Sequence, residues 1–144
     1  MIYKATKEDI CEIIEMAKRF EECTAHVPVD VEYAIKKYES LFDLGVGHMF
    51  GIRIDGKVVG GFGCIQGDDL HYPRKILVET FWFVLPEYRG CGKELLDAFE
   101  SLSKELHCDY RAMIHLEDSM SETLEHLYLQ RGYKLVEKHY IMEV

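Results

Sequence analysis

The fold is decided by the stretch from Val78 to Leu102, which reads VETFWFVLPEYRGCGKELLDAFESL. Its first seven residues, Val78 to Val84, are rich in β-branched and aromatic types and predict a buried strand. A turn follows at 85–88, then the segment RGCGK at 89–93, and the apolar residues after it recur at helical spacing. The stretch therefore predicts a strand, a glycine-containing loop and a helix, in that order.

A loop of this kind is suited to binding an anion. The first N–H groups of a helix have no partner within it, and that end of the helix dipole is positive. Gly90 and Gly92 carry no side chains, so a diphosphate can approach the backbone closely. Arg89 and Lys93 add positive charge at the same place. An ordinary strand-to-helix connection is the alternative interpretation of this segment.

Two familiar phosphate-binding patterns do not fit the loop. The P-loop pattern requires a glycine where Glu87 stands, and a serine or threonine where Glu94 stands. The dinucleotide-binding pattern requires a third glycine, at the position of Leu95.

The segment VLPEYRGCG at 84–92 instead resembles the acyl-CoA pyrophosphate loop of the GNAT superfamily, the acyl-CoA-dependent N-acyltransferases. In that family a strand leads into Val-x-Pro-x-Tyr-Arg-Gly-x-Gly and then a helix. The usual last Gly or Ala of the loop is replaced here by Glu94, which sets a like charge near the phosphates. The resemblance implies acetyl-CoA as co-substrate, no metal, and cofactor contacts from Trp82, Phe83, Val84, Arg89, Gly90, Cys91, Gly92, Lys93, Glu94 and Ser121.

Composition limits the other possibilities. The chain has 144 residues, of which 48% are hydrophobic and 30% charged, so we expect one globular domain over residues 1–144. A formal net charge of −9 argues against nucleic-acid or anionic-membrane partners. The five scattered cysteines are typical of reduced thiols in a cytoplasmic protein, and no metal-spaced His/Cys set appears.

The order of predicted elements is β-α-α-β-β-β-α-β-α-β-β, a mixed α/β arrangement similar to the whole GNAT fold. Strand, helix and strand over 78–116 form a right-handed crossover, hence a locally parallel pair. Asp55-Gly56 predicts a hairpin, and Gly60-Gly61 a bulge or a close approach by another element. The predicted strands are 2–5, 49–54, 57–66, 78–84, 110–116, 133–136 and 140–144. The predicted helices begin after Thr6, Asp30, Gly92 and Ser119, and the first of them runs to about Cys23.

A second segment, LYLQRGY at 127–133, resembles the Leu-Tyr-x-x-x-Gly-Phe segment of the family. The resemblance implies that Tyr128 protonates the leaving CoA thiolate, a role for which a neutral phenol is suited. A half-buried core tyrosine is the alternative. The family often has an asparagine seven residues earlier, where Ser121 stands. Ser121 is then either a cofactor contact or only a helix cap.

The base that deprotonates the acceptor amine is harder to assign. Glu79 lies on the strand before the loop and is the first candidate, acting directly or through water. Glu117 is the second, and His48 and His115 are weaker ones, because a lone histidine on an apolar strand is more often a core residue. A water relay without a base is a further alternative.

The resemblance implies direct attack of a primary amine on the thioester, whose carbonyl oxygen is held by strand amides at Trp82, Phe83 and Val84. These amides face a gap where this strand separates from 110–116. Covalent catalysis by Cys91 is disfavoured, because no histidine or asparagine partner is recognisable.

The acceptor is an unidentified amine, either a small molecule or a protein amine. Its site is expected among the first two helices and the loops 24–30 and 67–74, whose Asp68 and Asp69 can attract a cation. Homodimers are frequent in the family. The two departures at Glu94 and Ser121 leave a second function open, that of a non-catalytic acyl-CoA sensor or interaction module.

Overall fold

The computed structural model describes residues 1–144 in two compact units, unit 1 (Met1–Ile114) and unit 2 (His115–Val144). Unit 1 contains a five-stranded mixed sheet with helices α1 to α3, and unit 2 contains helix α4 (Ser121–Gln130). The predicted mixed α/β class is confirmed.

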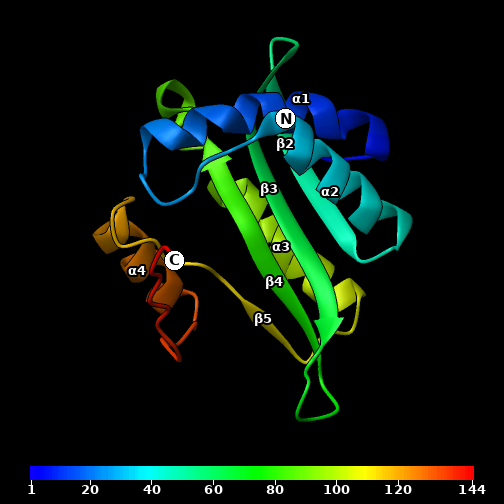
Figure 1. Ribbon diagram of the computed structural model, residues 1–144, viewed down its shortest axis with the longest axis vertical. Helices are drawn as coiled ribbons and strands as arrows, with labels where there is room; N and C mark the ends of the chain where they lie inside the picture. Colours follow the sequence, from blue (N-terminus) through cyan, green and yellow to red (C-terminus); the bar gives the residue numbers. More distant parts are fainter. The chain divides into compact units, whose positions relative to one another are not determined.

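The strands of unit 1 lie in the order β1-β2-β3-β4-β5 (Figure 1). Neighbouring strands are antiparallel except β4 and β5, which are parallel and are connected by α3 (Lys93–Glu105), as a crossover unit requires. The strands are β1 (Ile2–Lys4), β2 (Gly47–Ile54), β3 (Lys57–Asp68), β4 (Lys75–Val84) and β5 (Tyr110–Ala112).

Helices cover both faces of this sheet. Helices α1 (Ile10–Ala17) and α2 (Val31–Asp43) lie on one face and α3 on the other (Figure 1). The core under α1 and α2 is aliphatic, and on the α3 side the Phe62 and Phe99 rings lie 4.9 Å apart. No helix combines the length and the apolar character that crossing a bilayer requires. The buried residues of the first core cluster are Ala5, Ile10, Ile13, Ile14, Met49 and Val58.

Local signals in the sequence set several element ends. Asp30 caps α2 by accepting a hydrogen bond from the backbone N–H of Tyr33 at 3.0 Å. Gly45, with φ of +72°, follows the end of the same helix. Asp55 and Gly56 both have positive φ, as the tight β2–β3 hairpin requires.

The first helix differs from the prediction, which continued it to about Cys23. Helix α1 ends at Ala17 and is followed by a 3-10 segment, η2 (Lys18–Glu22). Side chains three residues apart eclipse one another in a 3-10 helix. Ion pairs at that spacing, Lys18–Glu21 and Arg19–Glu22, accompany the tighter winding.

Two strands carry an extra residue. Ile52 pairs with Gly60 but Arg53 pairs with Val58, so β3 bulges beside Gly60 as predicted. The predicted close approach is also present, because a Cβ on Gly61 would lie 2.7 Å from Ile13 Cγ2 of α1.

The second bulge is in β4. Gly63 of β3 pairs with Phe81 and Cys64 pairs with Glu79, which leaves Thr80 as the extra residue of β4.

Strand pairing is shorter than predicted at the C-terminal side. Strand β5 ends at Ala112 instead of Leu116, because the next available amide, that of Ile114, bonds to the Glu79 side chain and not to a β4 carbonyl. The predicted closing strands 133–136 and 140–144 are not formed. Alternating apolar residues make a strand only beside a partner, and unit 2 contains no other strand.

Candidate active site

The predicted strand, loop and helix are all present in unit 1. Strand β4 ends at Val84, a single 3-10 turn, η3 (Pro86–Tyr88), follows, and α3 begins at Lys93. Gly90 has φ of +118°, a conformation that side-chain-bearing residues rarely adopt. The backbone N–H groups of residues 90 to 93 make no backbone hydrogen bond. The loop therefore presents a row of donors at the positive end of α3, which is the arrangement that an anion requires.

The loop packs against side chains at the end of β4. A Cβ on Gly92 would lie 3.3 Å from Val84 Cγ2 and 3.5 Å from Trp82 Nε1, so the loop packs against these two side chains. Phe83 is buried and packs its ring 5.1 Å from that of Phe20 in η2. Of the three predicted strand residues, Trp82 and Val84 therefore contact the loop, and Phe83 contacts η2.

The charged groups of the loop are exposed. Arg89, Lys93 and Glu94 are all accessible to solvent, and the Arg89 guanidinium donates to the sulfur of Cys23 at 3.5 Å. Cys91 is half-buried, and its thiol donates to the Tyr88 carbonyl at 3.2 Å. This thiol is therefore a structural donor within the turn.

Glu79 is the one buried acidic side chain, with 6% of its surface exposed. Its Oε2 accepts a hydrogen bond from the Ile114 N–H at 2.9 Å. Burial raises the pKa of this carboxyl to about 8, and the Ile114 hydrogen bond opposes the rise. Glu79 directly follows the last β4–β5 pair, Val78 with Ala112, and so lies where the two strands part. A carboxyl with this pKa is mostly protonated at neutral pH and becomes able to accept a proton as the pH rises through about 8.

The gap between β4 and β5 begins at this point. Pairing of the two strands is confined to 76–78 with 110–112, so the rest of β4 has no strand partner on that side within unit 1. On its other edge β4 stays paired with β3 up to Val84.

Sequence reasoning did not single out Tyr38 of α2. Its hydroxyl lies 2.5 Å from the hydroxyl of Thr80, the bulged residue next to Glu79, and its ring packs edge-on against Phe81 at 5.9 Å. Burial raises the pKa of Tyr38 to about 12, so it remains a neutral phenol. The sequence shows only an apolar-face position on a helix, which gives no hint of the hydroxyl contact.

Two predicted site residues lie in unit 2. Tyr128 in α4 is buried, its ring lies 5.8 Å from that of Tyr133, and its carbonyl accepts from the Tyr133 N–H at 3.0 Å. Ser121 is the first residue of α4, and its hydroxyl lies 3.0 Å from Nε2 of His115.

The other candidate bases are placed less favourably. Glu117 is exposed, and His48 lies 2.8 Å from the amide oxygen of Gln66. The ring of His115 is engaged with Ser121. Among the four candidates, Glu79 alone is a buried carboxyl.

The predicted acceptor segment 67–74 does not lie beside the anion loop. Asp68 pairs with Lys75 at one end of the β3–β4 hairpin, whereas Gly60 pairs with Val84 at the other end, where the loop begins (Figure 1). The carboxylate of Asp69 is also engaged internally, by four groups. These four are the backbone N–H groups of His71 and Tyr72 and the side chains of Arg74 and Tyr110. Segment 67–74 therefore forms an internally bonded turn at the end of the hairpin away from the anion loop, and its part in an acceptor site stays a prediction.

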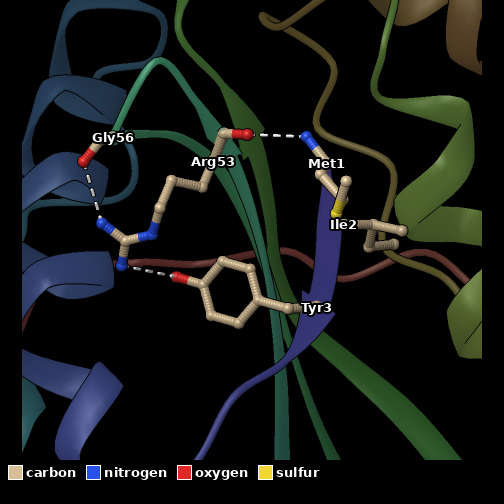
Figure 2. Close-up of a pocket in the computed structure, with 5 residues that line it drawn as sticks. All are labelled: Met1, Ile2, Tyr3, Arg53 and Gly56. Atoms are coloured by element: carbon tan, nitrogen blue, oxygen red, sulfur yellow. Dashed lines mark hydrogen bonds between the residues drawn. The ribbon is translucent and has the colours of Figure 1, made fainter.

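A surface pocket lies elsewhere, on the β1–β2 edge of the sheet (Figure 2). Its central group, Arg53, donates to the Gly56 carbonyl at 3.0 Å and to the Tyr3 hydroxyl at 3.5 Å, and it also pairs with Glu12. The Arg53 guanidinium is thus bonded to neighbouring groups of the protein, and we assign no function to this pocket.

Comparison with known proteins agrees with this geometry. The model of the acetyltransferase (GNAT) family matches residues 8–133. No curated protein matches in sequence. Several solved structures share the fold at low sequence identity.

One is a predicted acetyltransferase from Clostridium acetobutylicum, solved with acetyl-CoA, with a TM-score of 0.79 and 14% identity over 99% of this chain and 95% of that one. Another is a ribosomal-protein-alanine N-acetyltransferase from Brucella melitensis, with a TM-score of 0.73 and 20% identity over 100% and 99%. A third is an aminoglycoside 6'-N-acetyltransferase from Acinetobacter haemolyticus, with a TM-score of 0.74 and 13% identity over 100% and 97%. Since the family model spans most of the 144 residues, the chain belongs to the GNAT family of acetyltransferases.

Proposed function

We propose that the protein is an N-acetyltransferase that moves the acetyl group of acetyl-CoA to a primary amine by direct attack. The observation that carries this proposal is the row of unbonded N–H groups at residues 90 to 93, at the start of α3. The family match supports it and runs through both units, so we propose that residues 1–144 form a single acetyltransferase domain.

The loop holds the diphosphate of the co-substrate in this proposal. Four backbone donors and the dipole of α3 favour negative charge there, and Arg89 and Lys93 add to the attraction. Glu94 opposes it, but its exposed carboxylate is screened by solvent. Cys91 contributes its backbone amide, since its thiol is bonded to Tyr88.

The edge of β4 beyond Val78, which has no strand partner within unit 1, receives the thioester. We assign Trp82, Phe83 and Val84 to the pantetheine arm and the thioester oxygen. Successive N–H groups of a strand point to opposite edges and the Leu85 N–H donates to Val59 of β3, so the N–H groups of Trp82 and Val84 point toward this edge, where they stabilise the charge that develops during attack. Glu79, at the start of this edge, accepts a proton from the ammonium group of the acceptor, directly or through water, and the neutral amine then attacks the thioester carbonyl.

Tyr128 completes the reaction by protonating the departing thiolate. A neutral phenol carries one O–H donor and is suited to this transfer. The burial of Tyr128 in α4 and its position in the family segment at 127–133 support the assignment. Ser121 adds a contact to the co-substrate if its hydroxyl turns from His115.

The acceptor belongs to the class of primary amines. Two structures of the same fold are named for very different amines, a ribosomal-protein alanine and an aminoglycoside. The net charge of −9 favours a cationic acceptor over a neutral or acidic one.

Release of free CoA thiol tests the function. The full chain is mixed with acetyl-CoA and a panel of amines that includes peptides, polyamines and aminoglycosides. We expect thiol release that depends on one class of amine. Thiol release that is absent with every amine would contradict the proposal.

A second function, a non-catalytic acyl-CoA sensor, is favoured by one observation. The hydroxyl of Ser121, at the place of the usual asparagine, is already engaged with His115. Calorimetric CoA binding without any amine-dependent thiol release would identify this function.

A further inference from the structure

Arg19 joins the segment after α1 to the turn that leads into the anion loop. Its guanidinium donates to the two carboxylate oxygens of Glu87 at 2.7 and 3.3 Å and to those of Glu22 at 3.2 and 3.4 Å. Glu87 lies in η3, three residues before Gly90. Planar guanidinium and carboxylate groups that bond in this two-pronged way restrain orientation as well as distance.

The segment that carries Arg19 is itself anchored on the sheet. Phe20 of η2 packs its ring against that of Phe83, next to the end of β4. Beyond η2, Cys23 accepts a hydrogen bond from Arg89, which lies beside Gly90. Segment 19–23 therefore contacts the turn and the loop at two places.

The turn is held to the sheet by the buried Leu85 side chain, by Lys57 of β3, whose Nζ lies 5.8 Å from the Tyr88 ring, and by one backbone bond. The Leu85 N–H donates to the Val59 carbonyl at 2.9 Å. The next two backbone bonds, from Tyr88 to Leu85 and from Arg89 to Pro86, stay within the turn. The Glu87 side chain thus connects η3 to Arg19 of η2, a contact that the backbone of η3 does not make.

Arg19 also determines the charge beside the loop. Its hydrogen bonds hold the pKa of Glu87 below the usual range, so this carboxylate is ionised and paired. Without Arg19, the Glu87 carboxylate would keep only the weaker attraction of Lys57, and its negative charge would stand three residues before the N–H groups that face the diphosphate.

We propose that Arg19 is a positioning residue for acetyl-CoA, which acts through Glu87 and does not touch the co-substrate. By holding Glu87 it fixes the turn from which the N–H groups of residues 90 to 93 are presented. The inference depends on the proposed function, because it requires this loop to bind acetyl-CoA.

The test compares two arginines of the full chain. Arg19→Met removes the pair with Glu87, and Arg53→Met is the matched control, because Arg53 of β2 makes a similar two-pronged pair with Glu12 of α1 (2.9 and 2.7 Å). Both variants lose one positive charge. CoA affinity is measured by calorimetry. The kinetics with acetyl-CoA are measured with the amine that gives thiol release in the panel described under the proposed function.

We expect Arg19→Met to raise the Kd for CoA about threefold to fivefold, the range typical of an exposed ion pair, and Arg53→Met to leave it within about twofold of wild type. The KM for acetyl-CoA should rise by the same factor while kcat at saturation is unchanged. A general loss of folding would instead reduce the concentration of active protein and so lower kcat.

Glu87→Gln separates positioning from simple charge removal. Positioning requires this variant to weaken CoA binding too, and the double variant to bind no more weakly than Arg19→Met alone. Tighter binding by Glu87→Gln, or equal affinities for Arg19→Met and Arg53→Met, would overturn the inference while wild-type CoA binding still supports the proposed function. Failure of the wild type to bind CoA would overturn both.

Discussion

Glu79 shows how one side chain can define a site. It is a buried carboxyl on a strand whose other residues, except Lys75 and Thr80, are apolar or aromatic, and its hydrogen bond to Ile114 takes the place of a strand-to-strand bond. Its position just past the last β4–β5 pair makes it both the end of the parallel ladder and the nearest acid to the gap that follows.

The buried carboxyl should make stability depend on pH. In the unfolded chain it ionises near its ordinary pKa of 4.5, whereas in the folded protein it keeps its proton up to about pH 8. The folded state therefore binds the extra proton between these values, so stability is highest below pH 4.5 for this group and falls as pH rises through 8. Thermal unfolding of Glu79→Gln between pH 5 and 8 should show a smaller fall in Tm than wild type; parallel curves would contradict the expectation.

The same group should determine the pH dependence of turnover. As the base, Glu79 makes kcat/KM rise with pH and level off above about 8, and Glu79→Gln should lower kcat/KM at least tenfold and remove this inflection. The acceptor amine also ionises and can produce an inflection of its own. The pH dependence of kcat/KM is therefore measured with two amines of different pKa. An inflection that moves with the amine would assign it to the substrate and not to Glu79.

Tyr128 is tested by removing its hydroxyl alone. Tyr128→Phe keeps the ring contact with Tyr133 and should lower kcat by about an order of magnitude or more, with CoA affinity nearly intact. Tyr133→Phe is the matched control, since it also deletes one hydroxyl from the same ring pair. Equal turnover in wild type and Tyr128→Phe would remove the acid role.

At the scale of elements, the anion loop depends on one backbone conformation. Gly90 has φ of +118° and open space around it, so Gly90→Ala adds strain without a clash, at a cost of about 1–3 kcal/mol. We expect Gly90→Ala to weaken CoA binding as well as stability. Gly45→Ala is the control, because it adds the same kind of strain after α2, next to the Gly47–Ile65 pair, whereas the anion loop follows the Gly60–Val84 pair at the other end of β3. CoA affinities that are equal in the two variants would contradict this expectation.

Local chemistry made most elements of unit 1 predictable. Asp30, Gly45 and Asp55-Gly56 act through their own backbone or the next turn, so their effects can be recognised from sequence. Segments that need a distant partner were not predictable to the same degree. The strand at 110–116 is cut short by a side chain 35 residues earlier, and the alternation at 133–144 finds no strand to pair with.

In the candidate site too, residues of a local motif could be predicted from the sequence, and residues that act through a distant partner could not. The loop residues 89–93 were found because their spacing is a continuous motif, and Glu79 because it is an acid on an apolar strand. Tyr38 and Arg19 were missed, since each acts through a partner 42 or 68 residues away that no spacing rule connects.

At the scale of the whole molecule, the charge should influence which amines react. A net charge of −9 attracts cations over distances that salt screens. At saturating acetyl-CoA, kcat/KM for a triamine should fall about threefold from low to high salt, and that for a monoamine should fall less. Equal salt dependence for the two amines would show that the overall field plays no part.

The extra residue in β4 has an evolutionary consequence. All pairs on either side of Thr80 already match those of an unbroken ladder, so loss of this single codon would leave the remaining β3–β4 partners in place. The strand would straighten, and its contact with the α2 tyrosine would disappear. A three-nucleotide deletion is thus a single-step route to a descendant with the same strand partners and without the bulge beside Glu79.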